Sequence, residues 1–306
     1  MPARKSSRRF LKGYDSWGVI AEVKIFFEKI AVLGVGLIGG SLALSLKQRG
    51  LCGSIVGFGR KEGSLRRAQE LKIIDGYSLD AAKACMDADL IVFAVPVGLF
   101  KELALKAAAG LKKGAIVTDV GSVKGMLVFE MESLMPQGVR YVGSHPISGS
   151  ENSGIEEARA DLFEGAQCIL TPTESTDRNA LSSVTGLWSS VGCKTEEMTP
   201  LRHDEIYASV SHFPHMVAYA LVNSIDSVDP EFIRYAGQGF KDTTRIAMSS
   251  PEIWRDISVH NRENLLKLSR LFRERLELFD RLLASGDAPG IEEEFRKAKE
   301  ARSRLK

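Results

Sequence analysis

The 306-residue sequence predicts an α/β fold, in which a Rossmann-type, mostly parallel sheet is followed by an all-helical second domain. Three observations predict it. A G-x-G-x-x-G turn at Gly34–Gly39 lies between a short apolar strand and a helix. Short apolar runs then alternate with helix-forming segments up to about residue 199, which is typical of a parallel sheet. From Pro200 onward, long segments of helical period replace this alternation.

The predicted strands are short runs of aliphatic and β-branched residues. In chain order they are Ile30–Leu33, Ser54–Phe58, Leu90–Val95, Ala115–Asp119, Arg140–Gly143 and Gln167–Thr171, with a weaker last strand at Lys194–Met198. Helices are predicted between them at Leu37–Gly50, Glu62–Leu71 and Phe100–Ala109. We therefore expect a flexible basic arm at 1–28, a Rossmann domain at 29–199 and a helical domain at 200–306.

The overall charge and the cysteines exclude several classes of protein. A net charge of +2 with a pI near 8.3 gives no reason to expect a nucleic-acid partner. The cysteines at 52, 85, 168 and 193 form no C-x-x-C pair, so neither a zinc site nor a disulfide framework is indicated. We expect no metal and a reducing, cytoplasmic location.

Residues 30–46 carry no charge, which raises the alternative of a membrane-spanning helix. Four glycines occupy this stretch, and each costs about 1 kcal/mol in a helix interior, so no membrane span is expected. The basic residues Arg4, Lys5, Arg8, Arg9 and Lys12 precede it without the uncharged segment of a secretory signal. The arm is therefore expected to be disordered, with a transit peptide as the alternative.

The glycine turn predicts a dinucleotide site. Its context strengthens the motif, because the turn follows a strand, opens a helix and begins a βαβ unit. Glycines let the backbone approach a pyrophosphate, which then lies on the N–H groups of the helix start. A turn that needs glycine only for packing is the alternative. The expected cofactor contacts are Gly34, Gly36, Leu37, Ile38 and Gly39, with Val95, Pro96 and Ser122 after later strands.

The end of the second predicted strand bears on the choice of cofactor. NAD-binding folds usually carry an acid here that accepts from the ribose 2′-hydroxyl. This sequence has Gly59-Arg60-Lys61 instead, with no acid before Glu62. A small residue followed by Arg suits a 2′-phosphate, so NADP is slightly favoured and NAD is not excluded. Alternatively, Arg60 is an exposed cation over the adenine.

Two further motifs follow predicted strands, at the sheet edge where open α/β sheets bind their ligands. "TDVGSVKG" places Asp119 as a turn cap, Ser122 as a hydroxyl and Lys124 as a charge. "GSHPISGSENSG" places His145 just after another strand. A histidine there can take a proton from a substrate hydroxyl while a hydride leaves the same carbon. A structural, hydrogen-bonding histidine is the alternative.

The helical half adds two groups of polar residues. His212 and His215 lie three apart on one predicted helix face, but no matching carboxylate or cysteine supports a metal. A second segment, "GQGFKDTTRIAMSSPEIWRD", contains Lys241, Asp242, Arg245 and Trp254. Arg245 follows Asp242 by three residues, which fits either a structural ion pair or a clamp for a substrate carboxylate.

The longest predicted helix runs from about Pro251 to Ala284, with apolar residues near helical spacing. A helix of this length and apolar content needs a partner, so we expect a homodimer through the helical domain. A monomeric bundle core is the alternative.

Taken together, the motifs resemble the prephenate and arogenate dehydrogenases of tyrosine biosynthesis. The resemblance runs from about Lys29 to the C-terminus. It rests on six motifs in order: GVGLIGGS, TDVGSVKG, SHPISGSENSG, LTPTESTD, SHFPH and GFKDTTRIA, the last followed by EIWRD. It implies an NAD(P)+-dependent oxidative decarboxylation of prephenate to 4-hydroxyphenylpyruvate. Arogenate, converted directly to tyrosine, or use of both substrates, is the alternative.

The resemblance also implies roles for individual residues. His145 is similar to the residue that draws the proton from the 4-hydroxyl, and Ser122 to its neighbour in that contact. Arg245 is similar to an arginine that binds substrate carboxylate, from the same or the partner subunit. The residues that match the side-chain end of the substrate and the gate are His215, Glu151, Asp242 and Trp254, and Lys241 is a further substrate-binding candidate.

Other functions remain open at this point. Another dehydrogenase with a Rossmann half and a helical half, such as a β-hydroxyacid or pyrroline-carboxylate reductase, gives no reason for "SHPISGSENSG" and "GFKDTTR" together. A non-catalytic NADP-sensing dimer would not need both His145 and Ser122. We expect no regulatory ligand-binding domain after Ala301, so any feedback by tyrosine is expected to act at the active site.

Overall fold

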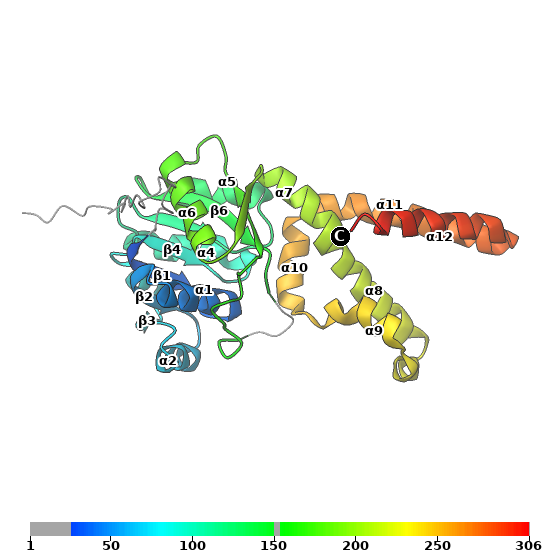
Figure 1. Cartoon of the computed structure of the whole chain (residues 1–306), viewed down its shortest axis with the longest axis horizontal. Helices are drawn as coiled ribbons and strands as arrows, with labels where there is room; N and C mark the ends of the chain where they lie inside the picture. The colour runs from blue at the N-terminus through cyan, green and yellow to red at the C-terminus, as the bar shows by residue number, and fades with distance from the viewer. Residues whose placement is uncertain (1–25, 150–153, 306) are drawn as a thin grey trace, which may run out of the picture.

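A computed structural model describes residues 26–149 and 154–305. The N-terminal domain, which ends with β8, is built on an eight-stranded sheet (Figure 1). The strand order is β3-β2-β1-β4-β5-β6-β7-β8. Neighbouring strands are parallel except β6 and β7, which confirms the predicted sheet. The strands are β1 Phe27–Leu33, β2 Cys52–Phe58, β3 Gly76–Ser78, β4 Leu90–Phe93, β5 Ile116–Asp119, β6 Arg140–Pro146, β7 Gln167–Thr171 and β8 Lys194–Glu197.

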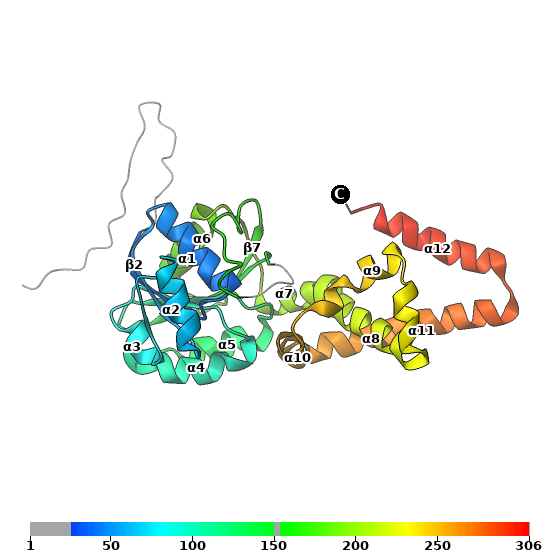
Figure 2. The same cartoon turned by 90° about the horizontal axis from the view of Figure 1, so that it is seen from below.

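Helices cover both faces of the sheet (Figure 2). One face carries α1 Leu37–Gln48, α2 Glu62–Glu70 and α6 Arg178–Ser190, and the other carries α3 Ala81–Cys85, α4 Phe100–Ala107 and α5 Gly125–Leu134. Successive strand residues point to opposite faces, so Ile30 and Val32 of β1 enter one core cluster while Ala31 and Leu33 enter the other. Burial on both faces explains why the central part of the sheet, such as Ile30–Leu33 of β1 and Leu90–Phe93 of β4, is continuously apolar in sequence.

The helical domain follows β8. Its elements are α7 Pro200–Tyr207, the π-helical η3 Ala208–His212, α8 Phe213–Val228, η4 Pro230–Tyr235, α9 Gln238–Thr244, η5 Arg245–Met248, α10 Pro251–His260, α11 Arg262–Ser285 and α12 Ala288–Arg302; the short 3₁₀ turns η1 Val97–Leu99 and η2 Ala108–Gly110 belong to the sheet domain. Helices α11 and α12 form a hairpin that extends away from the sheet (Figures 1 and 2). Gly286 ends α11 in the left-handed conformation, with φ of 67°.

Several predicted boundaries differ from the structure. Strand β1 begins at Phe27 and so includes the last two residues of the predicted arm, while residues 1–25 lie outside the described part. The short elements β3 and α3 were not predicted, since three and five residues are too few to show a period. The predicted single helix from Pro251 to Ala284 is wrong, because the chain bends at Asn261 and forms α10 and α11.

Within residues 26–149 and 154–305, no helix combines the length and the apolar character that crossing a membrane requires.

Candidate active site

Four neighbouring parallel strands bring the predicted site residues to one edge of the sheet. Strands β1, β4, β5 and β6 are adjacent and run in the same direction. Gly34 follows β1, Val95 follows β4, Ser122 follows β5, and His145 lies at the end of β6. Ligands of open α/β sheets bind outside this carboxyl edge, so these residues lie where a cofactor and a substrate would meet.

The glycine loop has the geometry that a dinucleotide needs. Gly34 has φ of 107°, and a Cβ there would lie 2.3 Å from the carbonyl oxygen of Ala94. A Cβ on Gly39 would lie 2.1 Å from the oxygen of Gly34, whereas one on Gly36 would meet nothing within 4 Å. Helix α1 begins after Gly36 without a side-chain cap. Open space before an uncapped helix start suits a pyrophosphate.

A cavity of about 330 Å³ lies beside this loop. It is lined by Gly34, Gly36, Gly59, Arg60, Lys61, Ser64, Val95, Pro96 and Lys106, among others. The predicted contacts Leu37, Ile38, Gly39 and Ser122 do not line it. Glu62, the acid nearest the end of β2, accepts hydrogen bonds from Arg66 at 3.2 Å and from the hydroxyl of Tyr77 at 3.1 Å. The residues present therefore fit a dinucleotide, and the cavity beside the glycine loop carries the cations Arg60, Lys61 and Lys106.

His145 lies inside strand β6, so the prediction that it follows the strand is wrong. Antiparallel pairing with β7 extends β6 to Pro146 and places His145 opposite Ile169. The side chain is only 9% exposed. Its Nδ1 atom lies 2.8 Å from Nε2 of His203, and its ring packs edge-on against Tyr207 with centroids 5.0 Å apart. These contacts with His203 and Tyr207 hold the imidazole in a defined orientation.

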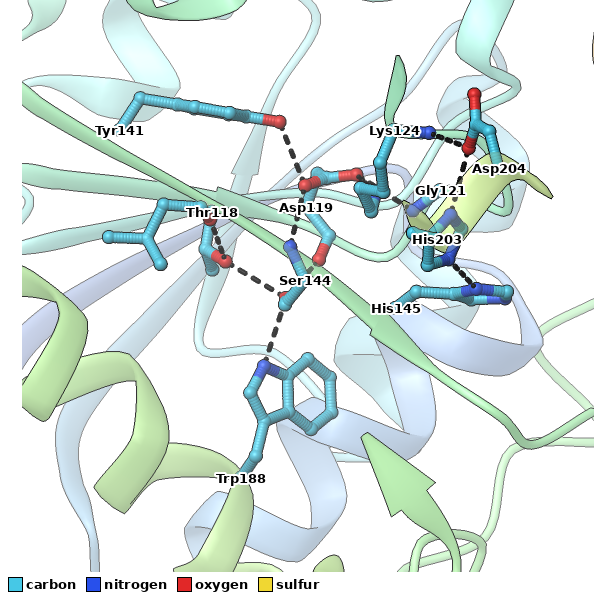
Figure 3. A network of polar contacts seen from close by, with 11 residues as sticks. Thr118, Asp119, Gly121, Lys124, Tyr141, Ser144, His145, Trp188, His203 and Asp204 are labelled. Carbon is cyan, nitrogen blue, oxygen red and sulfur yellow. Dashed lines mark hydrogen bonds and ion pairs between the residues drawn. The ribbon is translucent and has the colours of Figure 1, made fainter. Parts of the chain in front are cut away.

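Helix α7 supplies a second histidine and a carboxylate that the sequence analysis missed. Thr199 caps this helix by accepting from the N–H of Arg202 at 3.3 Å. The buried positions His203, Asp204 and Tyr207 follow one helical face. Nδ1 of His203 lies 2.8 Å from Oδ1 of Asp204 (Figure 3). A helix N-cap followed by a buried-face His-Asp pair was the available signal.

The turn that carries Ser122 is held by a buried ion pair. Lys124 Nζ contacts Asp119 Oδ2, and neither side chain is exposed to solvent (Figure 3). Asp119 also accepts from the Gly121 N–H at 2.9 Å, the Tyr141 hydroxyl at 2.8 Å and the Ser144 N–H at 3.1 Å. The expected capping role of Asp119 is present. Lys124, expected to offer a charge at the sheet edge, instead uses it inside the protein.

The histidines of the site are held neutral. Burial lowers the pKa of His145 well below its usual value, and the neighbouring His203, Lys124 and His212 lower it further. Burial, followed by Lys124 and His212, lowers the pKa of His203 to about 2. The pKa of His212 falls to about 4, chiefly through burial. A neutral imidazole can accept a proton, so His145 is suited to act as a base.

His212 lies next to the backbone of Ser122 and belongs to this cluster. The side chain of Asn261, at the bend between α10 and α11, donates to His212 Nδ1 at 3.0 Å and to the carbonyl oxygen of Asp204 at 2.9 Å. His212 Nδ1 therefore accepts, and Nε2 carries the hydrogen. In the sequence, the spacing of His212 and His215 indicated only a possible metal site and gave no sign of this position.

A second group of predicted residues lies deeper in the helical domain. The imidazole of His215 stacks on the indole of Trp254, with centroids 3.4 Å apart and planes at 19°. Burial lowers the pKa of His215, and the nearby charge of Arg245 also lowers it. Trp254 reaches the first group too, since its ring centroid lies 6.1 Å from that of His212.

The remaining predicted substrate residues are not brought to these groups by any described contact. Lys241 and Asp242 are exposed on α9, which lies beside α8 and away from the sheet (Figure 1). Asp242 accepts from Gln238 Nε2 at 2.7 Å. Glu151 lies outside the described residues. Among residues 26–149 and 154–305, no three His, Cys, Asp or Glu side chains are arranged to hold a metal ion.

Comparison with known proteins gives matches over both domains. Residues 42–197 match the family model of the prephenate dehydrogenase nucleotide-binding domain, and residues 199–297 match that of the prephenate dehydrogenase dimerization domain. The prephenate dehydrogenase of Bacillus subtilis is 33% identical, with 91% of this chain and 76% of that protein covered. The cyclohexadienyl dehydrogenase of Zymomonas mobilis is 32% identical, with 92% and 97% covered.

A solved structure agrees with these matches. The crystal structure of prephenate dehydrogenase from A. aeolicus, in complex with hydroxyphenyl propionate and NAD+, is 38% identical, with 91% of this chain and 98% of that chain covered and a TM-score of 0.86. Sequence motifs, fold and both family models agree, and the chain belongs to the prephenate dehydrogenase family.

Proposed function

We propose that this chain catalyses the oxidative decarboxylation of prephenate to 4-hydroxyphenylpyruvate with NAD(P)+, a step of tyrosine biosynthesis. The observation that carries the proposal is His145. It is a buried, neutral histidine at the same sheet edge as the glycine loop, where two domains meet. Arogenate, or both substrates as in a cyclohexadienyl dehydrogenase, is the alternative, because both offer the same ring and hydroxyl to His145.

A bound NAD(P)+ would supply the acceptor for the hydride that leaves C4 of the substrate. The residues that would hold the dinucleotide belong to the glycine loop, to the adjoining cavity and to the turn after β5. They are Gly34, Gly36, Leu37, Ile38 and Gly39, then Arg60, Val95 and Pro96, and finally Ser122. His145 accepts the proton of the 4-hydroxyl, and Ser122 orients the contact. Because the site lies between the sheet and the helical domain, burial also keeps water from competing for that proton.

We propose a preference for NADP+ over NAD+. Gly59 leaves room at the end of β2, and Arg60 and Lys61 line the cavity beside it. Glu62 is already engaged by Arg66 and Tyr77, which supports its absence from the ribose 2′-hydroxyl contact. A 2′-phosphate would gain charge-assisted hydrogen bonds from Arg60.

The side-chain end of the substrate is assigned to the helical domain. Arg245, His215 and Trp254 lie near one another and offer a cation, a hydrogen-bonding ring and an aromatic face. We assign substrate carboxylate binding to Arg245, contributed by the same or the partner subunit. Glu151, Lys241 and Asp242 are assigned to the same end of the substrate.

A homodimer through residues 200–306 belongs to the proposal, with residues 29–199 as the cofactor-binding unit. Large apolar side chains remain exposed on the helical hairpin: Leu266, Leu271, Leu276 and Leu283 on α11 and Phe295 on α12. Exposed apolar side chains of this size favour an interface in which a second copy of the chain covers the hairpin. Light scattering should give twice the chain mass of 33.5 kDa, and Leu276→Asp should lower it. The four cysteines are unpaired, which favours a reducing, cytoplasmic location.

The test is steady-state turnover of the purified chain on prephenate and on arogenate, each with NAD+ and with NADP+. Faster turnover of prephenate with NADP+ is expected. Faster turnover of arogenate selects the alternative substrate. Tight cofactor binding without turnover of either substrate would contradict an enzymatic role and favour a non-catalytic NADP-binding dimer.

A further inference from the structure

His145 is one end of a chain of three side chains. Its Nδ1 atom lies 2.8 Å from His203 Nε2, and His203 Nδ1 lies 2.8 Å from Asp204 Oδ1 (Figure 3). His203 and Asp204 come from α7, the first helix of the helical domain, whereas His145 comes from β6 of the sheet. A residue of the sheet domain is therefore held by the helical domain.

The direction of each hydrogen bond follows from the far end of this chain. Asp204 Oδ1 accepts the backbone N–H of Lys124 at 2.7 Å, so it also faces His203 as an acceptor. His203 must donate from Nδ1, which leaves the lone pair of its Nε2 directed at His145. His145 must then donate from Nδ1. Its other ring nitrogen, Nε2, is left unprotonated and can accept from a ligand.

The surroundings make this order stable. His203 is fully buried and Asp204 is 5% exposed. The titratable groups that face the chain from neighbouring elements are Lys124 before α5, with its partner Asp119 on β5, His212 of η3, Tyr207 of α7 and Cys168 of β7. The cationic Lys124 opposes a further positive charge on either ring, so neither histidine is protonated near neutral pH.

Gly125 shows that the position of Asp204 depends on close approach. A Cβ on Gly125 would lie only 2.5 Å from Oδ2 of Asp204. Real Cβ contacts are not that short, so any side chain at position 125 must displace the carboxylate. The glycine at the end of "TDVGSVKG" therefore permits the contact that sets the orientation of His203.

We propose that His203 and Asp204 are positioning residues that hold His145 in its Nδ1–H tautomer, so that Nε2 accepts the substrate hydroxyl proton. The inference rests on the proposed function for its catalytic consequence. The tautomer of His145 follows from the hydrogen bonds alone and does not depend on the proposed function. A wrong tautomer would present an N–H to the hydroxyl and could not take its proton, a fault that lowers turnover strongly in histidine-dependent enzymes.

The proton balance fits this role. As the hydride leaves C4, the hydroxyl proton passes to His145 Nε2. The imidazole of His145 then becomes a cation, and the Asp204 carboxylate lies on the far side of the His203 imidazole. The ring carboxylate then leaves as carbon dioxide, and the electron pair of the broken C–C bond enters the substrate ring. The C4 oxygen recovers the proton as the ring becomes aromatic. His145 ends unprotonated, so the chain needs to hold a proton only transiently.

The first experiment is NMR of the full chain with nitrogen-labelled histidine, with His145 assigned by comparison with the His145→Asn protein. We expect a protonated Nδ1 and an unprotonated Nε2 for His145. The opposite tautomer in the wild-type protein would overturn the proposal. This measurement needs neither substrate nor cofactor, so its result is independent of the proposed function.

The second experiment compares turnover of three variants. His203→Leu removes the acceptor and should lower kcat by about 10²- to 10⁴-fold with little change in KM. His203→Gln, whose carbonyl oxygen can still accept from His145, should recover much of the loss. Gly125→Ala displaces Asp204 without removing a polar group, and should lower kcat and mix the tautomers of His145.

The matched control is Glu205→Gln, the next residue on α7, whose exposed carboxylate contacts only Arg202 in the described hydrogen bonds. It should leave both kcat and the tautomer unchanged. Wild-type turnover in a folded His203→Leu protein, judged by circular dichroism, would overturn the proposal. A wild-type protein inactive on both substrates would overturn the proposed function, with the tautomer still decided by NMR.

Discussion

Lys124 and Asp119 form a fully buried ion pair across the turn that carries Ser122. Only four residues separate them in sequence, so the pair closes the loop between β5 and α5. Asp119 is also saturated by donors from Gly121, Tyr141 and Ser144. Burial and the negative charge of Asp119 raise the pKa of Tyr141 well above its usual value, so its hydroxyl remains a donor. The ion pair therefore stabilises the turn between β5 and α5 that carries Ser122.

Removing one partner of this pair should be costly. Lys124→Met leaves the Asp119 carboxylate buried without its counter-charge, a change that costs about 3–5 kcal/mol. Urea denaturation followed by circular dichroism measures the loss. The control is Lys101→Met, which breaks an exposed ion pair with Glu130 and should cost less than about 1 kcal/mol. Similar losses in the free energy of unfolding of the two variants would show that the buried ion pair contributes no more to stability than an exposed one.

Stability should fall as the solution is acidified from about pH 6.5. In the folded protein the pKa of His203 is about 2 and that of His212 about 4, and that of His145 is also depressed. The unfolded chain binds protons on these residues at about pH 6.5, so below that value it holds more protons than the folded protein. Each histidine then removes up to about 1.4 kcal/mol of stability per pH unit.

Denaturation curves at several pH values between neutrality and about pH 5 measure this slope. His212→Asn should make the slope shallower. His260→Asn, at an exposed histidine that ends α10, should leave it unchanged. A slope that is the same in all three proteins would mean that His212 makes no contribution to the pH dependence of stability.

Arg60 decides the cofactor preference if it binds a 2′-phosphate. Arg60→Ala should then raise the KM for NADP+ by about 10- to 150-fold, which corresponds to the roughly 1.5–3 kcal/mol of one charge-assisted hydrogen bond, and leave NAD+ nearly unaffected. Arg67→Ala removes an exposed cation of α2 outside the cavity and should change neither value. An equal effect of Arg60→Ala on both cofactors would remove the basis for an NADP+ preference.

Arg245 should control substrate affinity and not cofactor affinity. Arg245→Lys keeps the charge but loses the planar, two-pronged donor, so it should weaken substrate binding clearly. Arg245→Ala should weaken it further, by about 1.5–3 kcal/mol in total. Titration calorimetry with the product 4-hydroxyphenylpyruvate measures the affinity of both variants. Arg234→Ala, at an exposed arginine of η4, is the control. Unchanged affinity in Arg245→Ala would leave the residue only a structural role.

Most of the sheet could be predicted because its central strands contain short apolar runs, such as Ile30–Leu33 of β1 and Leu90–Phe93 of β4. Apolar runs and the glycine turn are local signals, and they located six of the strands and the cofactor loop. His145 shows the limit of such signals. Its strand is extended by antiparallel pairing with β7, which depends on residues more than twenty positions away. The local sequence around His145 therefore predicts a polar residue near the end of a strand, but it does not predict the pairing of that strand with β7.

The polar residues inside the site were the hardest to predict. His203, Asp204 and Asn261 are charged or polar types that usually lie at the surface, and only the meeting of α7, α5 and α10 buries them. Asn261 also breaks the predicted long helix, since its side chain is held by the carbonyl oxygen of Asp204 and by His212. Tertiary contacts of this kind override helical period.

His145 is the residue on which the reaction should depend most. Hydride departure from C4 builds positive character there, which is relieved as the hydroxyl proton passes to a neutral imidazole. Asparagine at this position can still accept a hydrogen bond but cannot take the proton, so His145→Asn should lower kcat by about 10²- to 10⁴-fold with little change in KM. Because burial, His203, Lys124 and His212 depress the pKa of His145, wild-type kcat should stay flat through neutral pH and fall only well below pH 6.5. His260→Asn should keep full activity. Near-normal turnover in His145→Asn would place the base elsewhere, with His215 the next residue to replace.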